Sequence, residues 1–389
     1  MHRSLHAPLE LGDVVRRFGP AFMRAQDPRL LPSQRKALAD IAACHTAARG
    51  GHRYRCGDCG ESFWVYHGCG NRSCPSCHTQ ATRQWIGQCQ TQLLGCRYFH
   101  MVVTVPESLR APFLAQQKRL YGLLMTTAAS CVLELARDPK FLGATPAILA
   151  VLHTWKGDLG FHPHVHLLVS AGGVSEDGHQ WIAPPNPKWL LPVRAVSKLM
   201  RKRFRARLQK SAPDLFQTIE PVTWKTGWNS FCKADDQGTQ PVVNYLARYL
   251  HRVAISNARL ITMDETHVTF RSKDSQTNRW RVLRLRGEEF LRRFVMHVLP
   301  RGFHKVRYYG LWHHSQRETR RRIRCLLAPK VSWPPPAPLL PDPSLPGEAQ
   351  SQTPLGPRDP EPTPAPPPCP HCKSQNVRLI ESLTRNRSP

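Results

Sequence analysis

Two pairs of cysteines near the N-terminus constrain the fold of this chain more than any other feature. Cys56 and Cys59 form one Cys-x-x-Cys turn, Cys74 and Cys77 form another, and fourteen residues separate the two pairs. Paired turns at about this distance bring four thiolates to one tetrahedral Zn²⁺, which predicts a structural zinc site. Such an ion supplies on the order of 10 kcal/mol to folding. We therefore expect residues 52–78, which are rich in Cys and Gly, to form a small zinc-ribbon-like module.

The remaining cysteines leave a second metal site open. Cys44, His52, His67 and Cys69 lie close to the two pairs in sequence and could form another zinc site. A late Cys-Pro-His-Cys run at 369–372 has no second pair within reach in sequence, so it forms half a site. The chain has 13 cysteines, and they are mostly clustered. Clustering of this kind is typical of metal binding in a reducing cytosol rather than of a disulfide framework.

The charge of the chain points to a polyanionic partner. There are 55 Lys and Arg residues against 27 Asp and Glu, a formal net charge of +28. Nucleic acid and an anionic membrane surface both satisfy that charge. No apolar run approaches the roughly 20 residues needed to span a bilayer, and the N-terminal segment has no signal-peptide core. We expect a cytoplasmic, nucleoid-associated protein that binds DNA and no membrane.

The hydrophobic pattern predicts an α+β chain. Helices are expected over 11–48, 107–137, 191–211 and 241–257. Strands are expected over 98–106, 147–155 and 162–171, and a hairpin over 267–286. Residues 328–368 are rich in Pro and have no periodic apolar pattern, which predicts a disordered linker.

The run FHPHVHLLV, residues 161–169, places histidines at every second position of an apolar strand. Side chains alternate along a strand, so His162, His164 and His166 should leave the same face while Val165 anchors the other. Imidazoles that face a cleft together can share a metal ion. A surface row of histidines without a role is the plainer interpretation, and the strand alone does not decide between them.

The run PVVNYLARYLHRVAISN, residues 241–257, predicts a helix with proline in its first turn. At 100° per residue one narrow arc of this helix carries Tyr245, Tyr249, Arg252 and Ser256, with Arg248 beside it. Tyrosines that share an arc with arginines suit contact with phosphate. Core or rim aromatics explain the same tyrosines equally well when the helix is considered alone.

The cysteine module, HPHVHLLV and YLARYLHRVAISN, in this order, resemble the IS91 family of rolling-circle transposases, which belong to the HUH endonuclease class. FHMVVTVPESLR and FVMHVLPRGFHKVRYYG are also similar to that family. The resemblance covers roughly residues 30–315. It implies a zinc-binding, DNA-binding domain over 1–95 and an HUH catalytic domain over 96–315, with a central antiparallel sheet flanked by helices. A basic and then Pro-rich linker over 316–368 and a tail over 369–389 would follow.

The resemblance also implies a mechanism. His164 and His166 would hold Mg²⁺ or Mn²⁺ beside a scissile phosphate in single-stranded DNA at the ends of the element. Tyr245 or Tyr249 would attack phosphorus, leaving a 5′-phosphotyrosine link for strand transfer and a free 3′-OH. Arg248 or Arg252 would help to stabilise the tyrosine anion and contact DNA.

The third ligand of the catalytic ion stays open. His162 has the right phase, but Pro163 could turn it away, and Asn244 and Gln240 are further candidates. No small-molecule organic cofactor is expected.

A basic helix offers further DNA contacts at Arg201, Lys202 and Arg203, although a solvated helix face is the default for such a run. Two other functions remain. A zinc-dependent, sequence-specific DNA-binding protein without catalysis would use the histidines structurally. A histidine-triad-like nucleotide hydrolase would use all three histidines of the His-x-His-x-His run.

Overall fold

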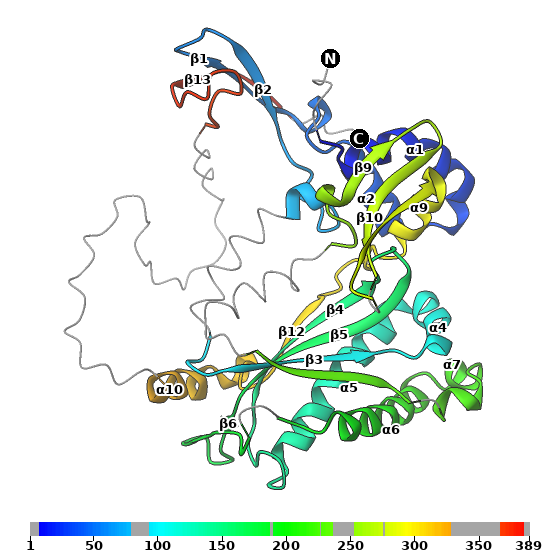
Figure 1. The fold of residues 1–389 in the computed structure, drawn as a ribbon, viewed down its shortest axis with the longest axis vertical. Coiled ribbons are helices and arrows are strands. Elements are labelled where there is room, and N and C mark those ends of the chain that lie inside the picture. The colour runs from blue at the N-terminus through cyan, green and yellow to red at the C-terminus, as the bar shows by residue number, and fades with distance from the viewer. Residues whose placement is uncertain are drawn as a thin grey trace, which may run out of the picture. The chain divides into compact units, whose positions relative to one another are not determined.

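The computed structural model describes residues 8–78, 93–186, 190–225, 227–235, 253–274, 277–327 and 366–384. They divide into two compact units (Figure 1). The large unit contains the described residues of 1–45 and 68–327, and the ribbon unit contains 46–67 together with those of 328–389. This division differs from the linear one expected from the sequence, because the end of the chain folds with an early segment. Helices and strands are mixed, which confirms the α+β class.

The secondary structure of the large unit has the following bounds. The helices are α1 (Leu11–Gln26), α2 (Pro32–Ala42), α4 (Arg110–Ala115), α5 (Gln117–Arg137), α6 (Val193–Ser211), α7 (Pro213–Gln217), α9 (Gly287–Val295) and α10 (Arg317–Leu327). The strands are β3 (Tyr98–Thr104), β4 (Ala147–Trp155), β5 (Phe161–Ser170), β6 (Gly173–Val174), β7 (Trp181–Ile182), β8 (Asn229–Asp235), β9 (Leu260–Met263), β10 (His267–Lys273), β11 (Trp280–Arg286) and β12 (Val306–Gly310). No helix among the described residues is long and apolar enough to cross a membrane.

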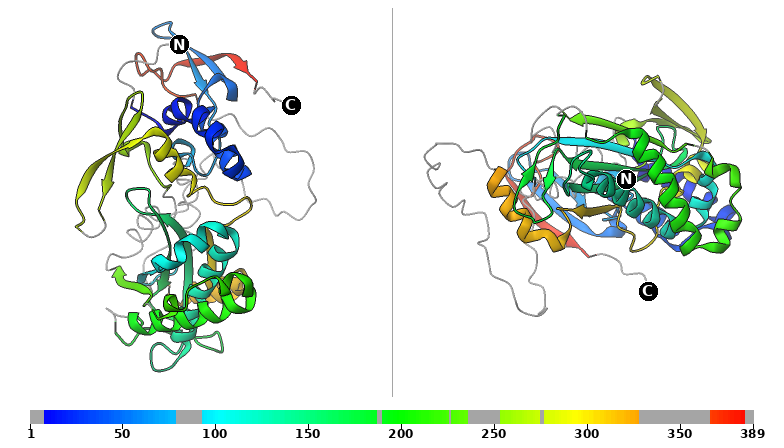
Figure 2. Two further views of the ribbon diagram at one scale, coloured as in Figure 1. Left: turned by 90° about the vertical axis from the view of Figure 1, so that its right-hand side faces the viewer. Right: turned by 90° about the horizontal axis from the view of Figure 1, so that it is seen from below.

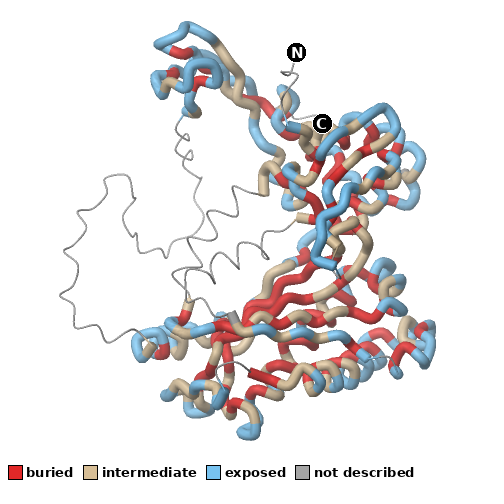
Figure 3. Tube along the Cα trace, viewed as in Figure 1, coloured by how far each residue is buried: buried red, intermediate tan, exposed pale blue. Residues whose placement is uncertain are grey.

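A five-stranded antiparallel sheet lies at the centre of the large unit, in the order β12-β4-β5-β3-β8. β4 and β5 are buried along most of their length (Figure 3). One face of the sheet packs against α5 and α6, which run side by side (Figure 2). The sequence of α6 explains this layer. Apolar residues four apart form one buried stripe along the helix, while the other positions are mostly basic. The stripe consists of Val196, Met200, Phe204 and Leu208.

The opposite face of the sheet has two different halves. One half is apolar, and Tyr98, Leu149 and Leu168 pack there with Trp312 and Ile323 of the C-terminal segment. Ile323 belongs to α10 and is fully buried. The folded part of the chain therefore extends to Leu327, into the stretch 316–368 that was expected to be a linker. The other half of this face carries histidines.

A second layer of the large unit is formed by α1, α2 and α9 with the antiparallel sheet β11-β10-β9. Phe18 of α1 packs in this cluster with Phe290 and Phe294 of α9. Gly287 begins α9, and a Cβ at that position would collide with the ring of Phe18. A glycine is required there so that the two helices can approach.

The ribbon unit is a three-stranded antiparallel sheet in the order β13-β1-β2. Its strands are β1 (Gly51–Cys56), β2 (Ser62–Tyr66) and β13 (Val377–Leu383). The central strand β1 therefore pairs on one side with β2, its neighbour in sequence, and on the other side with β13, from the C-terminal part of the chain.

Candidate functional site

Three histidines from two neighbouring strands form a cluster on the outer face of the central sheet. His164 and His166 come from β5, and His153 comes from β4, where it lies directly opposite His164. One ring nitrogen of each lies within 4.8 Å of the others, and we call this set the histidine cluster. The strand pattern predicted His164 and His166 together but gave no indication of His153.

Hydrogen bonds orient the rings of the histidine cluster. His164 Nδ1 lies 2.7 Å from the carbonyl oxygen of His162 and donates to it, which leaves Nε2 as a ligand atom. His166 Nδ1 lies 2.8 Å from Nε2 of His100 on β3, whose ring is stacked on it. Partners of this kind fix the orientation of metal-ligating imidazoles. The donor set of the cluster therefore suits a divalent metal ion.

His162 lies outside the cluster. Its Nδ1 accepts a hydrogen bond of 3.1 Å from Arg110. The register of β4 and β5 shifts here: His153 pairs with His164, but Trp155 pairs with Phe161, so β5 has one extra residue. This bulge breaks the alternation that placed His162 in phase with the other two histidines. The third histidine of the cluster is therefore His153, whereas the sequence had suggested His162.

The histidine cluster lines an open cleft of about 1240 Å³. The wall opposite the sheet carries cationic and aromatic side chains that include Arg271, Lys273 and Trp280. Lys273 and Trp280 are cross-strand partners on β10 and β11, and the Trp280 side chain is exposed. Small-molecule sites usually have volumes of about 300–1,000 Å³. A cleft of this size with cations and an exposed indole suits a nucleic-acid strand.

Burial keeps several histidines of this region neutral. It lowers the pKa of His100, His164 and His297 to about 4 each and that of His162 to about 3. His297 also lies between Thr154 Oγ1 and the carbonyl oxygen of Leu159, at 3.1 and 3.0 Å. Neutral imidazole is the form that ligates a metal.

These pKa values predict acid lability. As the pH falls below about 6.5, an unfolded chain binds protons at these histidines before the folded chain does. The contribution of the neutral histidines to stability is therefore complete above pH 6.5 and is lost progressively towards about pH 4. Urea midpoints measured between about pH 7.5 and 4.5 should fall steeply over that range, and less steeply in His297→Gln. A midpoint that does not change with pH would contradict the assignment.

Four cysteines of the large unit form the first cysteine group. Cys44 and Cys69 lie with Cys74 and Cys77, and all four sulfur atoms lie within 4.8 Å of one another. The N–H groups of Cys69 and Gly70 point at sulfur atoms, at 3.4 and 3.3 Å. Hydrogen bonds with Cys69 and Cys74 lower the pKa of Cys44 to about 4. The same neighbours, Cys44 and Cys69, raise the pKa of Cys74. Four converging sulfur atoms, two of which accept backbone N–H groups, suit one metal ion.

Cys56 and Cys59 have different partners. In the ribbon unit they lie with Cys369 and Cys372 of the late Cys-Pro-His-Cys run, and we call these four the second cysteine group. The single site expected at Cys56, Cys59, Cys74 and Cys77 is thus replaced by two groups of four, because each turn finds its partners by tertiary folding. His52 and His67 belong to neither group, and their rings contact each other with centroids 4.9 Å apart.

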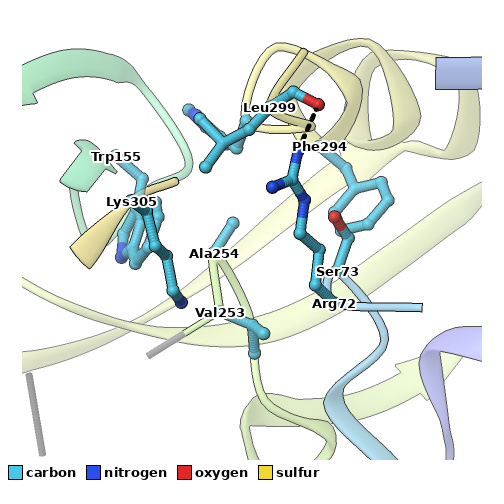
Figure 4. Close-up of a pocket in the computed structure, with 9 residues that line it drawn as sticks. Arg72, Ser73, Trp155, Val253, Ala254, Phe294, Leu299 and Lys305 are labelled. Carbon is cyan, nitrogen blue, oxygen red and sulfur yellow. Dashed lines mark hydrogen bonds between the residues drawn. The ribbon is translucent and has the colours of Figure 1, made fainter. Parts of the chain in front are cut away.

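Arg72 ties the first cysteine group to the segment that precedes β12. Its guanidinium donates to the carbonyl oxygen of Leu299 at 2.8 Å (Figure 4). It also donates to the carbonyl oxygens of Pro300 and Phe303, at 2.7 and 2.6 Å. A cavity of only about 30 Å³ lies beside it, lined also by Trp155 and Lys305. That volume holds a water molecule and no substrate. The region is a structural junction between the cysteine loop and β12.

The basic residues proposed on α6 lie far from the histidine cluster, because α6 covers the other face of the sheet. Arg203 pairs with Glu134 of α5 at 2.6 Å, and Arg201 donates to the carbonyl oxygen of Lys225 at 3.1 Å. Lys202 is exposed on the same helix. These contacts give Arg201 and Arg203 a role in packing, and the structure does not bring them to the cleft.

The expected tyrosine helix lies mostly outside the described residues, including Tyr245, Tyr249, Arg248 and Arg252. The candidates Asn244 and Gln240 lie outside them too. The end of the expected helix is described and is not helical. Ser256 has an extended backbone with φ −95° and ψ 152°, so the predicted helix does not reach 257. Ser256 and Val253 line the cleft, which brings the chain that follows the tyrosines to the histidine cluster.

Comparison with known proteins identifies relatives of the chain. A family model described as "Transposase zinc-binding domain" matches residues 14–105, and one described as "Putative transposase" matches residues 147–320. "Putative transposase y4qJ" of Sinorhizobium fredii is 39% identical over 343 residues, 84% of this chain and 86% of that protein. The transposase for insertion sequence element IS801 of Pseudomonas savastanoi pv. phaseolicola is 28% identical over 293 residues, 71% of this chain and 69% of that protein. No solved structure matches the chain.

The matches to a transposase zinc-binding domain and to a putative transposase domain show that the chain is a transposase. The chain belongs to the IS91 family of transposases. DNA is therefore its substrate class, and the chain contains a zinc-binding domain.

Proposed function

We propose that this transposase nicks single-stranded DNA at the ends of its element and transfers the strand through a 5′-phosphotyrosine intermediate. The observation that carries the proposal is the histidine cluster of His153, His164 and His166 in the wall of a basic cleft. The chain approaches this cleft at Val253, directly after the segment that contains Tyr245 and Tyr249.

The histidine cluster would hold one divalent ion, Mg²⁺ or Mn²⁺. Three imidazole ligands leave positions for water and phosphate oxygens, which both ions need. When bound, the ion would polarise the scissile phosphate and stabilise its developing charge. His100 and the carbonyl oxygen of His162 would hold the rings of His166 and His164 in place for this task.

The tyrosine would supply the nucleophile. Its Oη forms a bond to phosphorus as the bond from phosphorus to the 3′ oxygen breaks. The phenol loses one proton, and the leaving 3′ oxygen takes up one proton to become the free 3′-OH. The phosphodiester energy is kept in the phosphotyrosine link for transfer to a second strand. The helix was expected over 241–257, and on its part up to residue 252 Arg248 and Arg252 would lie beside the tyrosines.

The structure disfavours the two other functions that the sequence left open. A histidine-triad hydrolase needs the three histidines of His-x-His-x-His together, but His162 is bonded to Arg110 and the third member comes from another strand. A DNA-binding protein without catalysis has no need of three converging imidazoles in an open cleft. Duplex binding without any metal-dependent nicking would favour that second candidate.

An adduct assay tests the proposal. Full-length protein is incubated with labelled single-stranded element-end DNA and Mn²⁺, and a covalent protein–DNA product is sought on denaturing gels. We expect an adduct from the wild type and none from Tyr245→Phe/Tyr249→Phe. Tyr308→Phe, on β12, is the matched control and should keep the adduct. An unchanged adduct in the double variant would disprove the role of these tyrosines.

The position of the cations predicts which residues bind DNA. Lys273→Ala/Arg271→Ala removes two charges from the cleft and should weaken single-stranded DNA binding. The slope of log K against log salt concentration should become shallower by about 0.7 for each phosphate that the variant no longer neutralises. Lys202→Ala/Arg203→Ala removes the same charge from α6 and should change affinity and slope much less. A larger effect from the α6 pair, measured by fluorescence anisotropy, would place the DNA on the other face of the sheet.

A further inference from the structure

We propose that the second cysteine group holds a second structural zinc ion, bound half by an early segment and half by the C-terminal tail. Its members are Cys56, Cys59, Cys369 and Cys372, whose sulfur atoms all lie within 4.8 Å of one another. The zinc-binding domain match ends at residue 105, so the tail cysteines lie outside it. The inference is independent of the nicking chemistry.

The spacing of the sulfur atoms fits a shared ion. Cys56 Sγ lies 3.5 Å from Cys372 Sγ, and Cys59 Sγ lies 3.7 Å from Cys369 Sγ. A tetrahedral zinc ion with Zn–S bonds of about 2.3 Å separates its sulfur ligands by roughly 3.8 Å. A disulfide would bring two sulfur atoms to about 2.05 Å. The first cysteine group has the same spacings, 3.5 to 3.7 Å.

The two Cys-x-x-Cys turns have the same backbone conformation although they come from opposite ends of the chain. In each turn the N–H of the first cysteine donates to the carbonyl oxygen five residues later, at 2.9 and 2.8 Å. The N–H four residues later donates back to the carbonyl oxygen of that cysteine, at 3.1 and 2.9 Å. The donors of this second bond are Gly60 and Lys373, with φ of +76° and +65°.

A left-handed conformation is strained for a lysine, so its recurrence at the matching position needs a cause. Paired turns that each present two thiolates to one ion supply that cause.

Hydrogen bonds clamp the two turns against each other. The Asp58 carboxylate accepts from Ser374 Oγ at 2.5 Å and from Asn376 Nδ2 at 2.8 Å. The N–H of Gly57 donates to the carbonyl oxygen of Asn376 at 2.8 Å. These bonds join the residues between and after the cysteines, so the four sulfur atoms are held together by the surrounding turns.

The apolar core among the described residues of the ribbon unit is small. Its apolar cluster consists of Cys56, Cys369 and Val377, with Phe63 partly buried against them. Its described residues, 46–67 and 366–384, are close to the size of about 40 residues below which a domain needs a metal or disulfides. A zinc ion in the second cysteine group supplies that stabilisation.

Metal content tests the inference. The full-length chain is purified in a His164→Ala background, so that the histidine cluster does not add zinc, and zinc is counted by mass spectrometry of the metal. We expect two ions per chain in this background and one after Cys369→Ser/Cys372→Ser. The matched control is His371→Ala, which alters the same turn but no ligand and should keep both ions. With Co²⁺ in place of zinc, the thiolate-to-metal charge-transfer absorption should halve in the double variant.

Three results would overturn the inference. They are a count of one ion in the His164→Ala reference, an unchanged count of two in the cysteine double variant, and a count of zero in that variant. The last would mean that the two cysteine groups do not bind separate ions. Cys44→Ser/Cys74→Ser provides the reciprocal measurement, and it should remove one ion while leaving the tail cysteines occupied.

Discussion

Replacing His153 with alanine is expected to reduce the rate of adduct formation with single-stranded DNA at least about 100-fold, a barrier increase of about 2.7 kcal/mol. The side chain lies opposite His164 in the β4–β5 register and within 4.8 Å of the other two imidazole ligand atoms. Its loss removes one of three protein ligands, so metal affinity should fall as well. The rate should recover partly when the Mn²⁺ concentration is raised, which a defect in folding would not do.

His297→Ala is the matched control for this experiment. His297 is buried in the same unit and contacts Trp155, but it is not a member of the histidine cluster. Its replacement should lower stability without changing the Mn²⁺ concentration required for half-maximal rate. If both variants respond to Mn²⁺ in the same way, His153 is not a ligand.

Replacing Cys74 with serine is expected to release zinc from the first cysteine group and to unfold the N-terminal helices of the large unit. Cys74 and Cys44 are both buried, and they pack in one cluster with Ile41 of α2 and Leu11 of α1. A structural zinc ion contributes on the order of 10 kcal/mol, as much as the total stability of a typical domain. Zinc content and near-ultraviolet circular dichroism measure the two losses.

Cys325→Ser is the control for that change, because Cys325 is exposed on α10 and belongs to no cysteine group. A surface substitution of this type usually changes stability by less than about 0.5 kcal/mol. A Cys74→Ser variant that kept its zinc and its unfolding temperature would show that the first cysteine group is not a structural metal site.

The strands that build the site were predictable from hydrophobic pattern. The prediction of 147–155 coincides with β4, and the hairpin predicted over 267–286 consists of β10 and β11. These segments are apolar runs or alternating patterns bounded by turn residues, so local sequence decides their conformation. The family was also identified correctly from short motifs, because residues that hold metals recur at fixed spacings.

The pairing of His153 with His164 was hard to predict from the sequence. The turn between β4 and β5 runs from residue 156 to 160, so counting outwards from the pair Trp155 and Phe161 places His153 opposite Pro163. The extra residue of β5 shifts this register by one and brings His153 opposite His164. The exclusion of His162 depends on the same bulge and on a contact with Arg110.

The partners of the cysteines could not be deduced from spacing. Cys56 and Cys59 have a pair fourteen residues away, yet their sulfur atoms lie with a pair from the far end of the chain. Nearest pairs in sequence are favoured by loop-closure entropy, but that cost rises only slowly with loop length. Sheet pairing of β1 with β13 and the hydrogen bonds of Asp58 outweigh it.

The pairing of β1 with β13 determines when the ribbon unit can complete its folding during synthesis. Cys56 and Cys372 are 316 residues apart. At a translation speed of about 5–20 residues per second, roughly 15 to 60 s pass between the emergence of the two segments from the ribosome. An N-terminal module usually folds first, but here its outer strand is completed last. A chain that is terminated before Val377 lacks β13 and therefore does not complete the sheet of the ribbon unit.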